Sequence, residues 1–220
     1  MSFLGSVSRA LPSPIRERLR ALVVARRDER DWRAYRAAPT VPPPHVVKVR
    51  TVLDHARRFG IDTLVETGTF EGEMARKCAA SFRRVETIEL DPGLAAAAAR
   101  KLARLPNVRV IRGDSAAALA AVVASLEAPA VFWLDAHYSG EGTAKGDTET
   151  PLLREIAAIA TGRARGHVVL VDDARLLGTG DYPTADALRD ALARLDPGGG
   201  FEIRDDIARF TPPERARGAR

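Results

Sequence analysis

The sequence contains one cysteine, Cys78, among its 220 residues. A single cysteine cannot form an internal disulfide, and it excludes zinc sites that are built on several cysteines. Proteins of oxidising compartments depend on disulfides more often than proteins of reducing ones. We therefore expect this protein to work in the cytoplasm.

Long apolar runs are also lacking. The longest candidates, Val131–Leu134 and Val168–Val171, have the length of a strand, whereas a membrane-spanning helix needs ~20 apolar residues. Met1–Leu11 has neither the apolar region nor the small-residue cleavage site of a secretory signal. The sequence thus predicts no membrane insertion.

Aromatic residues make up only 5% of the chain, and the positive charge is unevenly placed. Residues 1–50 contain eleven Arg or Lys against four Asp or Glu, and the last ten residues are basic again, so the central part is mildly acidic. A nucleic-acid groove needs positive charge across the fold, and single-strand binding also uses aromatic platforms. We expect no nucleic-acid partner.

The remaining composition is that of a globular protein, with 45% apolar and 29% charged residues. The order along the chain predicts three parts: a basic helical arm with a proline-rich linker at 1–44, one domain at 45–212, and a disordered basic tail at 213–220. Within the arm, Thr40–Pro44 contains three consecutive prolines and is expected to be extended.

The arm has apolar residues at helical spacing between Pro14 and Arg36, namely Ile15, Leu19, Leu22, Val23 and Trp32. This pattern predicts an amphipathic helix, with a break near Arg26–Arg30. Its apolar face would serve a peripheral contact with an anionic membrane surface, a homodimer or a lid over a cleft. The alternative is a solvated helix that packs on its own domain.

After a helical run at His45–Phe59 that ends at Gly60, short apolar runs alternate with longer helical runs. The predicted strands are Thr63–Glu66, Val85–Leu90, Val108–Ile111, Ala130–Leu134, Val168–Val171, Phe201–Arg204 and Ile207–Phe210. The predicted helices between them are Glu73–Phe82, Pro92–Leu105, Ser115–Leu126, Pro151–Thr161 and Thr184–Leu195. Such alternation is typical of an α/β, Rossmann-like, doubly wound and mostly parallel sheet, here with a final antiparallel pair.

Ligands of such sheets bind beyond the carboxyl ends of the strands. The first strand runs into Glu66-Thr-Gly-Thr-Phe-Glu-Gly72, where Gly68 and Gly72 would let a ligand approach the backbone, although a plain helix-start turn has the same composition. The loop lacks the third glycine of a dinucleotide-binding fingerprint, which disfavours a nucleotide-dependent oxidoreductase.

The next two strand ends carry further polar residues. Glu89 stands 21 residues after Gly68, a place where a carboxylate can bind a ribose diol; helix capping is the alternative role, for which Asp91 before Pro92 is better placed. At the third strand end, Asp114 and Ser115 fit either a helix cap or an adenine amino group.

Together these strand ends, over about residues 61–210, resemble the class I S-adenosylmethionine-dependent methyltransferases. The resemblance implies a seven-stranded sheet with one reversed strand and S-adenosylmethionine as cofactor. It places the amino-acid part of the cofactor over the glycine loop, the ribose on Glu89 and the adenine near Asp114 and Ser115. The cofactor-binding set that it implies is Glu66, Thr67, Gly68, Gly72, Glu89, Asp114, Ser115 and Asp135.

Three aspartates follow the fourth and fifth predicted strands: Asp135, Asp172 and Asp173. Neighbouring buried carboxylates repel one another unless a positive charge lies between them, and a hard cation such as Mg²⁺ or Ca²⁺ prefers oxygen ligands. The alternative is that one aspartate caps a helix and another faces solvent. At this point the sequence resembles the metal-dependent branch, which includes catechol O-methyltransferase and the macrocin and mycinamicin sugar O-methyltransferases, and by that likeness the three aspartates hold the metal.

A metal site of this kind would lower the pKa of an acceptor hydroxyl. Asp135 would take part in catalysis through the cation, and His137 would accept the proton, because its ordinary pKa lies near neutrality. Lys145 is the rival base, and a structural role for His137 is the alternative.

Residues 137–150 form a long polar loop with three glycines, and a loop of this length inside a compact domain is usually functional. We expect Tyr138, Glu141 and Thr143 to contact the acceptor. The phrase from Asp135 through the Thr143-Ala-Lys-Gly-Asp-Thr segment resembles bacterial methyltransferase-like proteins found beside polysaccharide genes. This predicts methyl transfer to a sugar hydroxyl of a small molecule or oligosaccharide, such as a mannoside precursor of a methylated polysaccharide. The alternatives are a phenolic acceptor, which the scarcity of aromatic residues disfavours, and a non-catalytic binding module.

Overall fold

The structure is a computed structural model, and it describes residues 13–135 and 150–213. The chain divides into two compact units, Met1–Lys48 and Val49–Arg220. Each unit is described by itself below.

The first unit is dominated by one helix, α2 (Ser13–Ala37). The break expected near Arg26–Arg30 is wrong, because the helix is continuous through this segment. No proline or glycine lies in the helix after Pro14, and ion pairs one turn apart support it, with 2.9 Å between Arg33 Nε and Glu29 Oε1. None of the described helices is both long enough and apolar enough to cross a membrane.

A small apolar cluster ends this unit. Tyr35 packs with Val46 and Val47 of the first turn of α3 (His45–Phe59), and Trp32 covers the cluster. The intervening Thr40–Pro44 segment is not helical, as the prolines predict. Gly60, directly after α3, has a φ of 66° and so ends the helix as expected.

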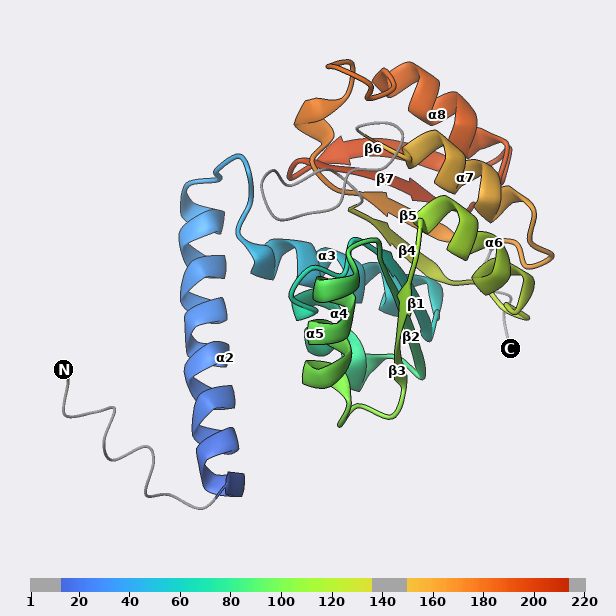
Figure 1. The fold of residues 1–220 in the computed structure, drawn as a ribbon. Helices are drawn as coiled ribbons and strands as arrows, with labels where there is room; N and C mark the ends of the chain where they lie inside the picture. Colours follow the sequence, from blue (N-terminus) through green and yellow to red (C-terminus); the bar gives the residue numbers. More distant parts are fainter. Residues whose placement is uncertain (1–12, 136–149, 214–220) are drawn as a thin grey trace, which may run out of the picture. The chain divides into compact units, whose positions relative to one another are not determined.

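The second unit is a seven-stranded sheet with helices on both faces (Figure 1). Its strands are β1 (Thr63–Thr67), β2 (Arg84–Glu89), β3 (Val108–Arg112), β4 (Val131–Leu134), β5 (Val168–Val171), β6 (Gly200–Arg204) and β7 (Ile207–Thr211). Their order in the sheet is β3-β2-β1-β4-β5-β7-β6. Strands β1 to β5 are parallel, and β7 pairs antiparallel with both β5 and β6. The predicted fold class is therefore confirmed, including the reversed strand.

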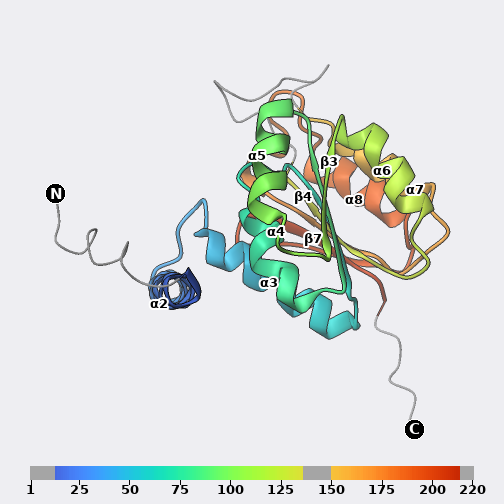
Figure 2. The same ribbon diagram turned by 60° about the horizontal axis from the view of Figure 1, so that its bottom comes forward.

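The helices divide between the two faces, and each face has its own apolar core (Figure 2). The helical elements after α3 are α4 (Glu73–Cys78), η1 (Ala79–Ser81), α5 (Pro92–Leu102), α6 (Ser115–Ala124), α7 (Leu152–Ala160), η2 (Ala174–Leu176) and α8 (Ala185–Ala193). α4, α5 and the part of α3 from Val49 onward cover one face, whereas α6, α7 and α8 cover the other. β1, β4 and β5 are buried along their whole length, as expected of strands between two helical layers.

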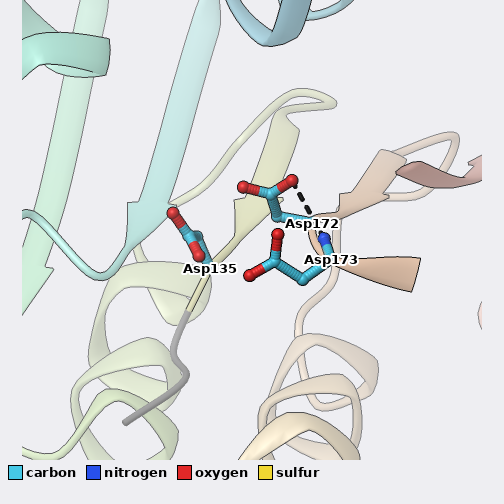
Figure 3. A group of neighbouring side chains, drawn as sticks. All are labelled: Asp135, Asp172 and Asp173. Carbon is cyan, nitrogen blue, oxygen red and sulfur yellow. Dashed lines mark hydrogen bonds between the residues drawn. The ribbon is translucent and has the colours of Figure 1, made fainter. Parts of the chain in front are cut away.

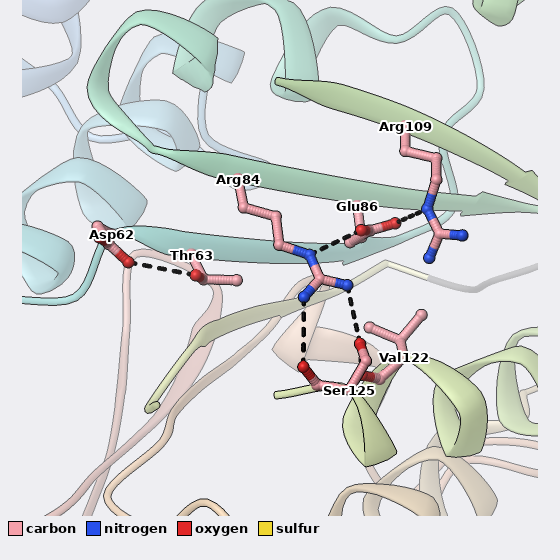
Figure 4. A network of polar contacts seen from close by, with 7 residues as sticks. All are labelled: Asp62, Thr63, Arg84, Glu86, Arg109, Val122 and Ser125. Atoms are coloured by element: carbon pink, nitrogen blue, oxygen red, sulfur yellow. Dashed lines mark hydrogen bonds and ion pairs between the residues drawn. The ribbon is translucent and has the colours of Figure 1, made fainter. Parts of the chain in front are cut away.

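A polar network holds the β2–β3 side of the sheet to the end of α6 (Figure 4). The buried Glu86 carboxylate accepts hydrogen bonds from Arg84 Nε at 2.8 Å and from Arg109 Nε at 2.6 Å. Arg84 also donates to Ser125 Oγ at 2.9 Å. This buried carboxylate thus has cationic partners within the protein.

Candidate active site at the carboxyl edge of the sheet

The strand order reverses between β1 and β4, because β2 and β3 lie on one side of this pair and β5 on the other. In open parallel sheets, ligands bind at the carboxyl ends of the strands beside such a reversal. The chain leaves β1 at Thr67 and β4 at Leu134 on this edge, so the residues that follow them form the candidate site.

The loop after β1 is held against β2 by its backbone. Gly68 and Thr69 donate their N–H groups to Ile88 O at 3.0 and 3.2 Å. Gly68 and Gly72 have φ values of 82° and 74°, which glycine adopts easily. A Cβ at Gly72 would lie 3.0 Å from Leu102 Cδ1. Both glycines therefore have backbone reasons for their positions.

Glu89, at the end of β2, organises this loop. Its Oε2 accepts the Phe70 N–H at 2.8 Å, and its Oε1 accepts the Asp91 N–H at 3.0 Å. Phe70 has a φ of 46°, and its side chain is 55% exposed. Each carboxylate oxygen can accept more than one hydrogen bond, so Glu89 retains capacity for a ligand such as a ribose diol.

Glu66 lies deeper than expected of a ligand-binding group. It is 2% exposed, and Thr87 Oγ1 donates a hydrogen bond to its Oε2 at 2.6 Å. Burial, together with the nearby carboxylates of Asp135 and Glu89, raises the pKa of Glu66 to about 8. Glu66 therefore carries a proton at neutral pH, and Thr87, whose hydroxyl also lies 2.6 Å from Thr69 Oγ1, links it to the loop.

Asp114 and Ser115 stand at the start of α6, as predicted. Asp114 caps the helix by accepting the Ala117 N–H at 2.9 Å, and Arg154 lies 3.4 Å from the same carboxylate oxygen. Asp91 caps α5 in the same way, through the Leu94 N–H at 2.8 Å. The capping role of both aspartates is confirmed, and Ser115 is buried beside this cap.

Asp135, Asp172 and Asp173 converge at the ends of β4 and β5 (Figure 3). One carboxylate oxygen of each lies within 4.8 Å of the others; Asp172 and Asp173 are buried and Asp135 is partly buried. Asp172 Oδ1 accepts the N–H of Asp173 at 2.9 Å, and Asp173 has a φ of 54°. The predicted acidic cluster is thus present, in a spacing that is compatible with oxygen ligands of one hard cation.

Two residues near this cluster were not predicted from the sequence. Arg175 in η2 donates to Asp173 Oδ1 at 2.7 Å and also pairs with Asp206, which lies in the turn between β6 and β7. Arg175 therefore supplies part of the positive charge that three neighbouring carboxylates need. Arg175 follows Asp173 by two residues in the sequence, and this closeness could have identified it. Asp206 could not be identified in this way, because its position depends on how β6 and β7 pair.

Glu155 of α7 is a further residue that sequence reasoning missed. It lines the same pocket as Asp135, Asp172, Asp173 and Tyr182 and is 1% exposed. Burial raises its pKa to about 7, and interactions with the hydroxyls of Ser115 and Thr67 lower it in part. A glutamate on the buried face of an apolar helix was the signal that could have identified it.

The predicted catalytic residues His137 and Lys145 lie outside the described residues, as do the predicted acceptor contacts Tyr138, Glu141 and Thr143. Two other histidines have structural partners: His55 Nδ1 lies 2.7 Å from Thr51 O, and His167 Nδ1 accepts the Ala130 N–H at 3.1 Å. Cys78 is buried, and burial raises the pKa of its thiol to about 12, so it is no nucleophile.

Comparisons with known proteins establish the fold. No family model and no curated protein matches the sequence. Among solved structures, an O-methyltransferase from Bacillus cereus bound to SAH is 17% identical with a TM-score of 0.54, covering 83% of this chain and 87% of that one. The O-methyltransferase TomG from Streptomyces achromogenes bound to SAM is 20% identical with a TM-score of 0.52, covering 84% and 86%.

The N-methyltransferase NodS from Bradyrhizobium japonicum is 16% identical with a TM-score of 0.51, covering 76% of this chain and 95% of that one. The chain therefore has the Rossmann-like fold of methyltransferases. Because the three proteins are named for transfer to different atoms, the fold alone leaves the acceptor atom open.

Proposed function

We propose that the protein is an S-adenosylmethionine-dependent methyltransferase that uses a divalent cation and methylates a hydroxyl oxygen, with a sugar as acceptor. The observation that carries this proposal is the convergence of Asp135, Asp172 and Asp173 at the carboxyl edge of a methyltransferase fold. A cofactor site needs no such cluster, whereas a cation held by it would help to activate a hydroxyl group.

The residues of the β1–β2 edge fit the cofactor. Gly68 leaves the start of the loop without a side chain, and Glu89 presents a carboxylate at the end of β2 whose two oxygens are oriented by backbone N–H groups. Asp114 and Ser115 lie at the end of β3, where the adenine is expected. The order of these groups along the edge supports binding of an adenosine derivative.

The three aspartates fit a hard cation, because all of their donor atoms are carboxylate oxygens. When bound, the cofactor would supply the methyl group and the cation would lower the pKa of the acceptor hydroxyl. The chain would hold the acceptor oxygen at the Asp135 end of the cluster, facing the cofactor side of the edge. His137 would accept the hydroxyl proton as the methyl–oxygen bond forms, and Lys145 is the alternative base.

Two observations support a sugar over a phenol as acceptor. Tyr182 is the one aromatic residue among the described residues that line the pocket, so flat-ring stacking has little to build on. The polar loop that follows Asp135 supplies hydroxyl and carboxylate groups, including those of Tyr138, Glu141 and Thr143, which suit a polyhydroxyl ligand. An oligosaccharide or small glycoside is the acceptor class that we propose.

Calorimetric titration tests the proposal in two stages. S-adenosylmethionine and S-adenosylhomocysteine should both bind with micromolar affinity, and Mg²⁺ should give a separate heat that EDTA abolishes. A panel of glycosides and catechols is then incubated with labelled cofactor in the presence of Mg²⁺ or EDTA. Transfer to a glycoside only with Mg²⁺ is expected. Failure to bind either cofactor form would overturn the proposal in favour of a non-catalytic binding module.

A further inference from the structure

Glu155 is a buried carboxylate that the mechanism above does not use. It lies in the first turn of α7 with 1% of its surface exposed. The hydroxyls of Ser115 and Thr67 lie near enough to lower its pKa, but neither carboxylate oxygen makes a hydrogen bond of good geometry with the described residues. Leaving a buried polar group without a partner is unfavourable by ~1–3 kcal/mol, and by more for a charged one. Its position therefore calls for a partner from outside the described residues.

The surroundings of Glu155 indicate what this partner must offer. The hydroxyls of Ser115 and Thr67 and the carboxylates of Asp114 and Asp135 exert the strongest influences on it after burial itself. Thr67 Oγ1, at the end of β1, is also buried without a hydrogen-bond partner in the part of the chain that the structure describes. Because carboxylates surround Glu155, the missing partner is a hydrogen-bond donor and not an anion.

The location connects Glu155 with the cofactor. Thr67, Asp114, Ser115 and Asp135 come from the ends of β1, β3 and β4, which form the edge where the cofactor is proposed to bind. Glu155 reaches the same place from α7 and lines the pocket that contains Asp135. Resting on the proposed function, we propose that Glu155 contacts the cofactor and accepts a hydrogen bond from one of its amino groups.

S-adenosylhomocysteine has two amino groups that fit: the 6-amino group of adenine and the ammonium group of its amino-acid part. Two analogues separate them. S-inosylhomocysteine has an oxygen in place of the 6-amino group, and 5′-methylthioadenosine lacks the amino-acid part. Each analogue removes one donor and leaves the rest of the nucleoside in place.

The experiment is calorimetric titration of these three ligands into the wild-type protein and Glu155→Gln, in EDTA so that no cation takes part. The glutamine has nearly the same shape as the glutamate. Its uncharged amide accepts hydrogen bonds through one oxygen only, and more weakly than the carboxylate does. The variant should bind S-adenosylhomocysteine at least tenfold more weakly than the wild type does. One of the two analogues lacks the amino group that Glu155 contacts. For this analogue, the affinities of the variant and the wild type should agree within twofold.

Glu127→Gln is the matched control, because Glu127 is an exposed carboxylate between α6 and β4, and it should bind all three ligands as the wild type does. Thermal unfolding of each variant checks that the fold is intact. Wild-type affinity of Glu155→Gln for S-adenosylhomocysteine, or an equal loss for all three ligands, would overturn the inference alone. A wild-type protein that binds none of the ligands would overturn the proposed function as well.

Discussion

Buried carboxylates occur in two regions of the sheet, and their hydrogen-bond and ion-pair partners differ. On the β2–β3 side, Glu86 accepts hydrogen bonds from two arginines and is part of a network that ends at Ser125. At the carboxyl edge, Asp135, Asp172 and Asp173 lie within 4.8 Å of one another, and Glu155 has no hydrogen-bond partner among the described residues. Glu86 thus serves the fold, whereas the carboxylates of the edge, of which Asp173 pairs with Arg175, would serve the ligands of the proposed function.

The comparison predicts opposite consequences for removing charge in the two regions. Neutralising Glu86 removes an acceptor that two guanidinium groups use, so the folded state loses stability. Neutralising a carboxylate at the edge removes repulsion or a buried charge, so the folded state keeps or gains stability while function is lost. The four predictions below test this contrast.

The largest effect is expected from Asp172→Asn. The substitution removes one charged oxygen ligand from the cluster, and turnover with Mg²⁺ should fall by at least ~100-fold, which corresponds to about 2.7 kcal/mol of transition-state free energy. The affinity for S-adenosylhomocysteine in EDTA should stay unchanged. Rates of methyl transfer measure the turnover, and calorimetric titration with S-adenosylhomocysteine in EDTA measures the affinity for the cofactor product. A separate titration with Mg²⁺ measures the affinity for the cation.

Asp181→Asn is the control for this prediction, because Asp181 is an exposed aspartate in the loop after η2. An Asp172→Asn protein that binds Mg²⁺ with wild-type affinity would show that the acidic cluster is no cation site. The three aspartates would then have no role in cation binding. Their difference from Glu86 in ion-pair partners would have to be explained by solvent exposure.

Glu86→Gln should act on stability and not on turnover. Breaking a buried ion pair leaves the partner charges without compensation, but both arginines retain contact with water, with side-chain exposures of 29% for Arg84 and 61% for Arg109. We therefore expect a loss of about 1–2 kcal/mol in the free energy of unfolding, measured by urea denaturation. Cofactor binding at the other edge should not change, and a stable Glu86→Gln protein with weakened cofactor binding would contradict the division into two regions.

Glu155→Gln should change stability in the opposite direction. The pKa of Glu155 is raised from its ordinary value to about 7 in the folded protein, so the folded state holds a proton that the unfolded state releases. Stability therefore falls as pH rises between about 4.5 and about 7, and the penalty remains above that range. Gln does not titrate, so the variant should be about 1–3 kcal/mol more stable than the wild type at pH 8.

At pH 5 this gain should largely disappear, because the wild-type carboxyl group is then protonated in both states. Urea denaturation of both proteins at pH 5 and pH 8, without cation or cofactor, gives the two differences. A gain that is the same at both pH values would mean that Glu155 does not titrate in this range. The group would then have a partner of its own, as Glu86 does.

The sequence was sufficient for most of the fold, because strand and helix signals in a parallel α/β sheet are local. Gly60, Asp91-Pro92 and Asp114 mark element ends by their own backbone chemistry, and each stands where it was expected. The break in α2 was wrongly predicted. The charged residues near Arg26–Arg30 interrupt the apolar pattern, but ion pairs one turn apart support a continuous helix.

The site was predictable only where its residues follow strand ends directly. Asp135, Asp172 and Asp173 were identified because parallel strands bring their carboxyl ends to one edge. Glu155 and Asp206 reach the site from a helix face and from a turn between antiparallel strands, and their positions depend on packing that no local pattern specifies. Glu66 was assigned to the cofactor through the family resemblance of the glycine loop. It is buried and accepts a hydrogen bond from Thr87, and its contact with the cofactor stays a prediction.

The smallest effect is expected from Arg175→Gln, and it probes how far the protein supplies its own cation at the functional edge. The Arg175 guanidinium holds Asp173 and Asp206, so its removal leaves the three clustered carboxylates less compensated. Without divalent cation, the variant should lose about 1 kcal/mol of stability. Mn²⁺ should restore the lost stability, and it should raise the melting temperature of the variant more than that of the wild type. Arg189→Gln, which breaks an exposed pair with Asp186 on α8, should show no such dependence on Mn²⁺. If both variants respond to Mn²⁺ as the wild type does, Arg175 and the cation act on different charges. The carboxylates of the edge would then be compensated within the protein, as Glu86 is, and the contrast between the two regions would fail.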